Sequence, residues 1–337
     1  DGALRNARLD TFKLSPGDSL KVEVDKTAGG YKTTVRGNSL DARSLLKASL
    51  GAANDSHDGK ARAGKGNDSE IDLKVAILSG YNGEAMSNAE LRLASDGANL
   101  RRLTFSAKLN GKDVRGALNQ PSASGGVLSV SSDDAGGLLR FLDIYPRMRG
   151  GHLQLQLSGA LDRQNGLMSV RDFALHDEPA LRGMASGRPN AMASAGDVTG
   201  ATPAAADVPF ARLRAEFVRE PDRLTFKDAV MWGQQVGGSV SGTMDYGRDR
   251  VHLTGTFVPA YQLNNFFAQV PLLGRLLGGG EHEGLFAVSF QISGKASAPV
   301  LKISPLSALA PGFLRKLFEF QREDAVAPPP RPVESNR

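Results

Sequence analysis

The chain has 337 residues, a formal net charge of +5 and no cysteine. The lack of cysteine excludes a disulfide framework and a thiolate metal site. Glycine occurs 39 times and aromatic residues make up only 6% of the chain, which is typical of many short strands joined by tight turns. The basic residues are scattered, so we assign them to a solvated outer face. Attraction to anionic lipid head groups is the alternative, and nucleic acid is not a predicted partner.

The first part of the chain predicts strands around one helix. Leu20, Val22 and Val24 alternate with charged residues, as in a half-buried strand. A helix is expected over residues 41–50, with Asp41 as its N-cap, and it is followed by a polar loop. Further alternating stretches predict strands at residues 71–75, 91–93, 103–105 and 127–130.

The middle of the chain repeats this arrangement. A second helical patch is predicted over residues 133–145 and ends at Pro146, which cannot continue a helix. Gly-Gly pairs, among them Gly136-Gly137 and Gly150-Gly151, are interpreted as turns that need a positive φ. Alternation returns after Pro146 and again from Phe210 onward.

A short motif occurs twice at a fixed offset. Segments 41–47 (DARSLLK) and 134–140 (DAGGLLR) lie 93 residues apart (134 − 41 = 93), and a degraded third copy contains Phe266-Phe267. Repetition of one unit is typical of an extended surface rather than of a single reaction centre. We therefore predict a mainly β fold: an elongated, curved antiparallel sheet that forms an open apolar groove, with short amphipathic helices inserted and at the C-terminus.

The pattern divides the chain into four segments. Residues 1–182 form a repeated β-groove segment with helical inserts near 41–50 and 133–145, and residues 183–208 form a linker or mobile loop. Residues 209–321 form a C-terminal β-groove segment with helices near 261–277 and 306–320. Residues 322–337 are expected to be a disordered tail.

The motifs that carry chemistry fail at defining positions. The run from Gly59 resembles a phosphate-binding loop but has Gly66 where a serine or threonine must hold magnesium. The run from Asn54 resembles a calcium loop but has Lys65 where a bidentate glutamate is required. No nucleophile elbow follows a buried strand. We therefore predict no catalytic residue, no metal site and no cofactor, and expect that the chain is not an enzyme.

Two amphipathic segments are candidates for contact with a membrane. The segment near residues 261–277 is either a core helix that caps the end of the sheet or a plug or lip that touches acyl chains. The segment near residues 306–320 is either a terminal helix docked on its own sheet or an interfacial helix on an anionic membrane. The candidate membrane-contact residues are Phe266, Phe267, Leu272, Leu273, Leu276, Leu277, Phe313, Leu314, Arg315, Lys316, Leu317 and Phe318.

The second helical patch and its surroundings carry a family resemblance. Segment 133–143 (DDAGGLLRFLD), followed by Gly150-Gly151 and the strand from Leu153 to Leu157, resembles the carboxy-terminal region of the AsmA-like proteins of Gram-negative bacteria. Segment 290–295 (FQISGK), followed by Pro299, is similar to a strand-and-turn ending common in that family. The resemblance covers about residues 1–320, and the large, YhdP-type members are the most similar.

The resemblance implies a bridge-like phospholipid carrier that moves lipid through the periplasm toward the outer membrane along an apolar β-groove. It also implies a tether to the inner membrane through a segment absent from this chain, contact with a membrane surface on the outer-membrane side, and envelope proteins as further partners. The alternative is a non-enzymatic envelope scaffold that binds assembly proteins and carries no lipid. The residues predicted to face lipid are Leu153, Leu155, Leu157, Val251, Leu253, Val288, Phe290 and Ile292.

Overall fold

The computed structural model describes residues 5–51, 68–97, 99–122, 125–160, 162–178, 207–233, 236–258, 288–296 and 298–304. The strands in these ranges are β1 (Asn6–Phe12), β2 (Ser19–Lys26), β3 (Gly30–Asp41), β4 (Asp68–Ser79), β5 (Ala85–Asp96), β6 (Asn99–Leu109), β7 (Lys112–Ser122), β8 (Gly125–Ser132), β9 (Met148–Ala160), β10 (Arg163–His176), β11 (Asp207–Glu220), β12 (Arg223–Trp232), β13 (Gly237–Asp245), β14 (Arg250–Val258), β15 (Val288–Lys295) and β16 (Ala298–Ser304). The helices are α1 (Arg43–Gly51) and α2 (Ala135–Phe141).

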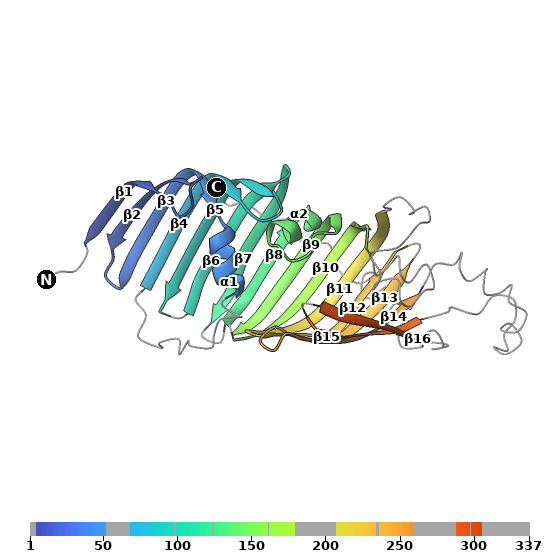
Figure 1. The fold of residues 1–337 in the computed structure, drawn as a ribbon. Coiled ribbons are helices and arrows are strands. Elements are labelled where there is room, and N and C mark those ends of the chain that lie inside the picture. Colours follow the sequence, from blue (N-terminus) through green and yellow to red (C-terminus); the bar gives the residue numbers. More distant parts are fainter. Residues whose placement is uncertain are drawn as a thin grey trace, which may run out of the picture.

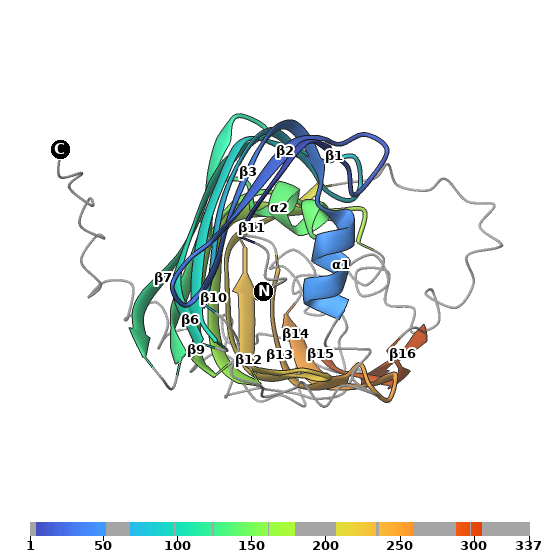
Figure 2. The ribbon, with the colours of Figure 1, turned by 90° about the vertical axis from the view of Figure 1, so that its left-hand side faces the viewer.

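All sixteen strands belong to one sheet in which each strand pairs with its neighbours in sequence (Figure 1). The pair β3 and β4 is parallel, with Asp68 at the start of β4 beside Gly30 at the start of β3; the other neighbours are antiparallel. Viewed along its length, the sheet bends into an open trough, and both helices lie on its concave side (Figure 2). The predicted mainly β, curved and open sheet is confirmed.

The concave face is built by a continuous line of cross-strand partners. One residue from every strand lies in this line, which we call the central row, and each is apolar or glycine. The central row is Leu9, Val22, Val35, Leu73, Leu91, Phe105, Gly116, Val130, Leu155, Met168, Ala215, Ala229, Val240, Gly255, Phe290 and Ile303. Because side chains alternate between the two faces of a strand, these residues share one face.

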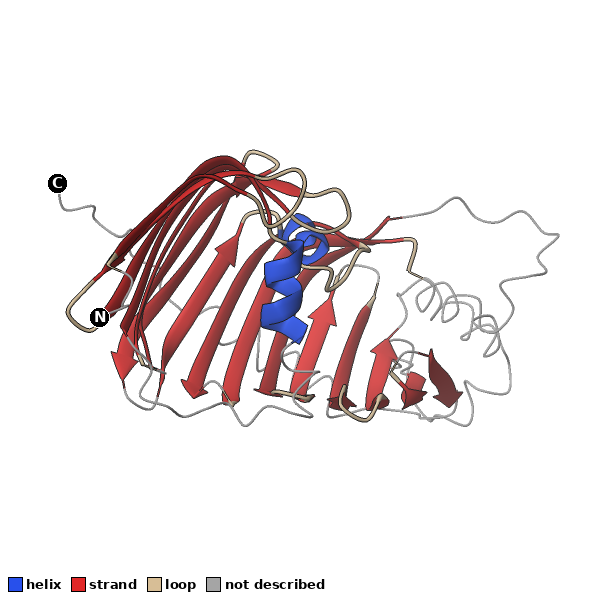
Figure 3. Cartoon of the chain, turned by 60° about the vertical axis from the view of Figure 1, so that its left-hand side comes forward, coloured by secondary structure: helices blue, strands red, loops and turns tan. Residues whose placement is uncertain are grey.

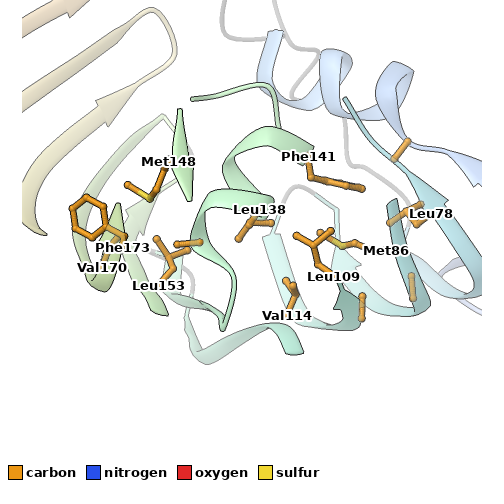
Figure 4. Close-up of a cluster of buried hydrophobic side chains, with 14 of the residues drawn as sticks. Leu78, Met86, Leu109, Val114, Leu138, Phe141, Met148, Leu153, Val170 and Phe173 are labelled. Carbon is orange, nitrogen blue, oxygen red and sulfur yellow. The ribbon is translucent and has the colours of Figure 1, made fainter. Parts of the chain in front are cut away.

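Both helices begin at one edge of the sheet, which we call the helix edge, and α1 extends from it across the open side of the trough (Figure 3). Leu138 and Phe141 of α2 are buried in a cluster with Met86 and Leu109 from neighbouring strands (Figure 4). Each fully buried side chain of this size stabilises the fold by about 1.5–3 kcal/mol. The main core therefore lies beneath α2.

Asp134 caps α2. Its Oδ1 accepts a hydrogen bond from the Gly137 backbone N–H at 3.0 Å, and its Oδ2 accepts one from the Asn110 amide at 3.0 Å. In the first copy of the motif Asp41 has a related role, because its Oδ1 accepts from the Arg43 backbone N–H at 3.0 Å. The repeated aspartate thus starts a helix at both places where a strand leaves the sheet at the helix edge.

Two details of the sequence interpretation need correction. The Gly136-Gly137 pair is not a turn between strands but lies inside α2, where a Cβ on Gly136 would approach the Met148 carbonyl oxygen to 2.3 Å. Gly150 and Gly151 do have positive φ values of 63° and 91°, but they lie within β9.

The helices differ slightly from their predicted bounds. The helices begin two residues later than predicted, at Arg43 and Ala135, and α2 ends at Phe141 rather than at residue 145. The predicted linker over residues 183–208 lies outside the described residues except for its last two, which begin β11. The predicted tail and the helices near 261–277 and 306–320 also lie outside the described residues.

Replacing Asp134 tests the cap. Burial by itself raises the pKa of Asp134, but hydrogen bonds from Asn110 and the Gly137 N–H outweigh it and hold the pKa below its ordinary value of 3.8. We expect Asp134→Ala to lower the free energy of unfolding at pH 7 by about 1–2 kcal/mol in urea titrations. A depressed carboxylate pKa stabilises the fold above the unfolded-state pKa, so this difference should shrink as the pH falls below about 4.

The neighbouring Asp133 supplies the control for the cap. It is exposed and forms only a surface contact with His152 at 3.1 Å, which contributes little to stability. Asp133→Ala should therefore leave the unfolding midpoint almost unchanged. Equal losses for the two variants would contradict the role assigned to Asp134.

Large rings on the concave face lie over glycines of neighbouring strands. A Cβ on Gly166 would come within 2.2 Å of Cζ of Phe217, and a Cβ on Gly255 within 2.4 Å of Cζ of Phe290. We expect Gly166→Ala to displace the Phe217 ring and to lower the free energy of unfolding by roughly 1–3 kcal/mol. Gly17→Ala is the control, because no atom lies within 4 Å of its added Cβ; matching thermal midpoints for the two variants would contradict this packing.

Candidate functional site

The two faces of the sheet differ in chemistry. The convex face carries cross-strand ion pairs, such as Arg36 with Asp72 at 3.0 Å and Lys74 with Glu90 at 3.0 Å. These side chains alternate with central-row residues along the same strands. The four side chains are between 29% and 47% exposed, so the convex face is solvated here and the concave face is the candidate binding surface.

Cover on the concave face is uneven. Next to α2, Leu153 is 5% exposed and Val170 is fully buried. Farther from the helix edge, Leu155 and Leu157 on β9 are only half-buried, as are many residues of the central row. Within the described part of the chain, no second sheet covers these strands. The apolar face is therefore packed beside α2 and half-buried at many positions farther from it, although Ala215, Ala229 and Val251 are buried as well.

The residues predicted to face lipid come together on this surface. Leu153, Leu155 and Leu157 lie on β9, Val251 and Leu253 on β14, and Val288, Phe290 and Ile292 on β15. The cross-strand registers place seven of them on the concave face, and the side chain of Val288 lies outside the described part of the chain. Leu253, Phe290 and Ile292 are half-buried, and Val251 is 4% exposed. The candidate membrane-contact residues at 266–277 and 313–318 lie outside the described residues.

An apolar cavity of about 330 Å³ lies on the concave face over β11 to β16. Its lining includes Met231, Val240, Leu253, Phe290 and Ile292, so three of the predicted lipid-facing residues contribute to one space. A cavity of this size is within the range that holds a small ligand or part of an acyl chain. Most of the wall offers hydrophobic contact.

The cavity has a polar end that the sequence did not predict. Tyr145, in the loop after α2, donates a hydrogen bond to Glu178, and both residues line the cavity. Burial raises the pKa of Tyr145 well above its ordinary value, and the hydrogen bond to Glu178 acts in the same direction. The tyrosine therefore stays protonated and serves as a neutral donor. No periodic pattern links these two residues, which meet only because β10 returns to the helix edge.

The described residues lack a metal-binding cluster and a membrane-spanning helix. These ranges contain no cluster of three or more histidine, aspartate or glutamate side chains able to bind a metal ion. No described helix has the length and apolar character needed to cross a membrane.

The chain was compared with models of protein families, with curated proteins and with solved structures, and none of them matches it.

Proposed function

We propose that this chain carries phospholipid along the concave face of its sheet. The central row supports this proposal most strongly, because it presents an apolar or glycine residue on every one of the sixteen strands and has no covering sheet among the described residues. The resemblance to AsmA-like proteins supports a setting in the periplasm, with lipid moving toward the outer membrane. It also supports a tether to the inner membrane outside this chain and a membrane surface at the far end.

The length of the row favours a path over a single binding site. Sixteen strands spaced by about 4.8 Å give a row roughly 70 Å long. One acyl chain is about 15 Å long, since two of them span the hydrocarbon core of a bilayer, which is about 30 Å thick. The central row is therefore several times as long as one acyl chain of the proposed cargo.

Lipid can move along such a path only if the apolar lining is uniform along its length. Each methylene moved from water to an apolar surface is stabilised by about 0.8 kcal/mol, so a gap in the apolar lining would trap lipid on either side of it. A row without a charged or amide side chain has no such gap. Lipid head groups would remain in water at the open side of the trough, where they keep their hydration.

Crosslinking tests which face meets lipid. Photoreactive side chains at Leu157 and Leu253 should form adducts with phospholipid when the protein is irradiated with vesicles of bacterial lipid. The same groups at Gln156 and Thr254, which point to the convex face of the same strands, should form few. Mass spectrometry of the adducts measures both sets. Equal labelling of the two faces would refute the assignment, and the absence of lipid would favour the envelope scaffold.

A carboxylate in the central row should interrupt the path. We expect Leu155→Asp to reduce the phospholipid that co-purifies with the chain by about tenfold, because an ionised group facing an acyl chain costs more than about 1.4 kcal/mol. Gln156→Asp places the same charge on the exposed face and should leave the lipid content unchanged. Circular dichroism spectra of both variants are compared with that of the unaltered protein to establish that the variants fold. A folded Leu155→Asp protein with normal lipid content would contradict the proposal.

A further inference from the structure

A cation, Arg219, lies on the concave face beside the apolar rows. Arg219 follows Phe217 by two residues on β11, so it shares the face of the central row. Its cross-strand partners are Gln164 on β10 and Leu224 on β12. The line continues through Met244 and Val251. Arg219 therefore lies at the edge of the sheet opposite the helix edge, directly beyond the apolar rows.

The charge of Arg219 is not balanced by a carboxylate. Its Nη1 donates to Oε1 of Gln164 at 3.0 Å, and Gln164 is only 7% exposed. The acidic residues nearby have other partners, since Glu220 pairs with Arg163 and Asp245 with Arg223. Within the described residues, no carboxylate oxygen lies within the 4.0 Å limit of an ion pair with Arg219. A half-buried guanidinium with one neutral partner has donors left for an anion.

Arg219 lines a cavity of about 540 Å³. The opposite wall comes from the helix edge, with Leu46 and Lys47 of α1 and Ile144 of the loop after α2. Its two carboxylates are engaged elsewhere, since Glu220 pairs with Arg163 and Asp143 accepts from Asn82 at 3.0 Å. Two further cations line the same space as Arg219, beside apolar side chains: Lys47, and Arg223, which pairs with Asp245 at 3.3 Å.

We propose that Arg219 binds the phosphate group of a phospholipid whose acyl chains lie on the apolar rows, with Lys47 as a second, exposed cation at the same cavity. The proposal rests on the proposed lipid-carrying function and adds a preference for lipids that bear a phosphate. A guanidinium matches the geometry of phosphate oxygens and forms two parallel hydrogen bonds with them. Phe217, and Phe226 at a ring distance of 6.3 Å from it, begin the apolar surface about 7 Å from Arg219 along the strand.

Two lipids with identical acyl chains separate the head group from the tails. The full-length protein, freed of lipid, is incubated with vesicles that contain fluorescent phosphatidic acid or fluorescent diacylglycerol, and the transferred lipid is measured. We expect the unaltered chain to prefer phosphatidic acid and Arg219→Gln to lower its affinity for that lipid about tenfold, with diacylglycerol binding unchanged. Arg219→Lys keeps the charge and should restore part of the preference. Lys21→Gln, on the exposed convex face, is the control and should change neither affinity.

The outcomes separate this inference from the function on which it rests. Equal binding of the two lipids by the unaltered chain, or an equal loss of both in a folded Arg219→Gln protein, overturns the phosphate site and leaves lipid carriage intact. Binding of neither lipid by the unaltered chain overturns lipid carriage itself. Calorimetry with inorganic phosphate distinguishes a site for the free anion: affinity equal to that for phosphatidic acid would contradict the assignment to a lipid head group.

Discussion

Side-chain alternation, kept in phase across sixteen strands, is the constraint on which the trough depends. A slip of one residue in any pair would turn the apolar side chains of the following strands to the convex face. The phase changes near the helix edge, where Asn88 and Asp172 have positive φ values of 51° and 54°, and again in β12, where the pairing with β13 shifts between Phe226 and Ala229. Near Asn88 and Asp172, Leu78 and Phe173 face the concave side, where alternation alone would face them outward. The helix edge therefore gains a core without loss of the apolar rows.

Two short helices then determine which part of the face is closed. Residues of α2 bury the ends of several strands. The backbone of α2 can approach the backbone of β9 closely because Gly136 has no side chain against Met148. The remaining rows lack such a cover among the described residues. Contiguous exposed apolar surfaces of this size mark interaction sites, and under the proposed function acyl chains would occupy this one. Stability and the proposed function thus use different parts of one face.

Local patterns predicted the fold class and the facing of the strands, whereas contacts between distant residues could not be predicted. Alternation at Leu153, Leu155 and Leu157 is visible within one strand, and the repeated aspartate marks both helices. The parallel pairing of β3 with β4 depends on how the chain returns after α1, which periodicity does not encode. The contact of Arg219 with Gln164 joins residues 55 apart and requires the register of β10 and β11. The shared facing of the alternating apolar residues was therefore foreseen, and the polar positions at the ends of their rows were not.

Those polar positions differ between the two edges, and the difference gives the trough a direction across its strands. At the helix edge Glu178 already accepts from Tyr145 and lies 4.0 Å from Arg147, so its charge is satisfied by the protein. At the opposite edge the partner of Arg219 among the described residues is the neutral amide of Gln164. A phosphate therefore finds open donors at Arg219, whereas Glu178 offers it none. Under the proposed function, a lipid bound at Arg219 would lie across the strands with its head group there and its tails toward α2, and the apolar rows between the edges would set how much of each tail is covered.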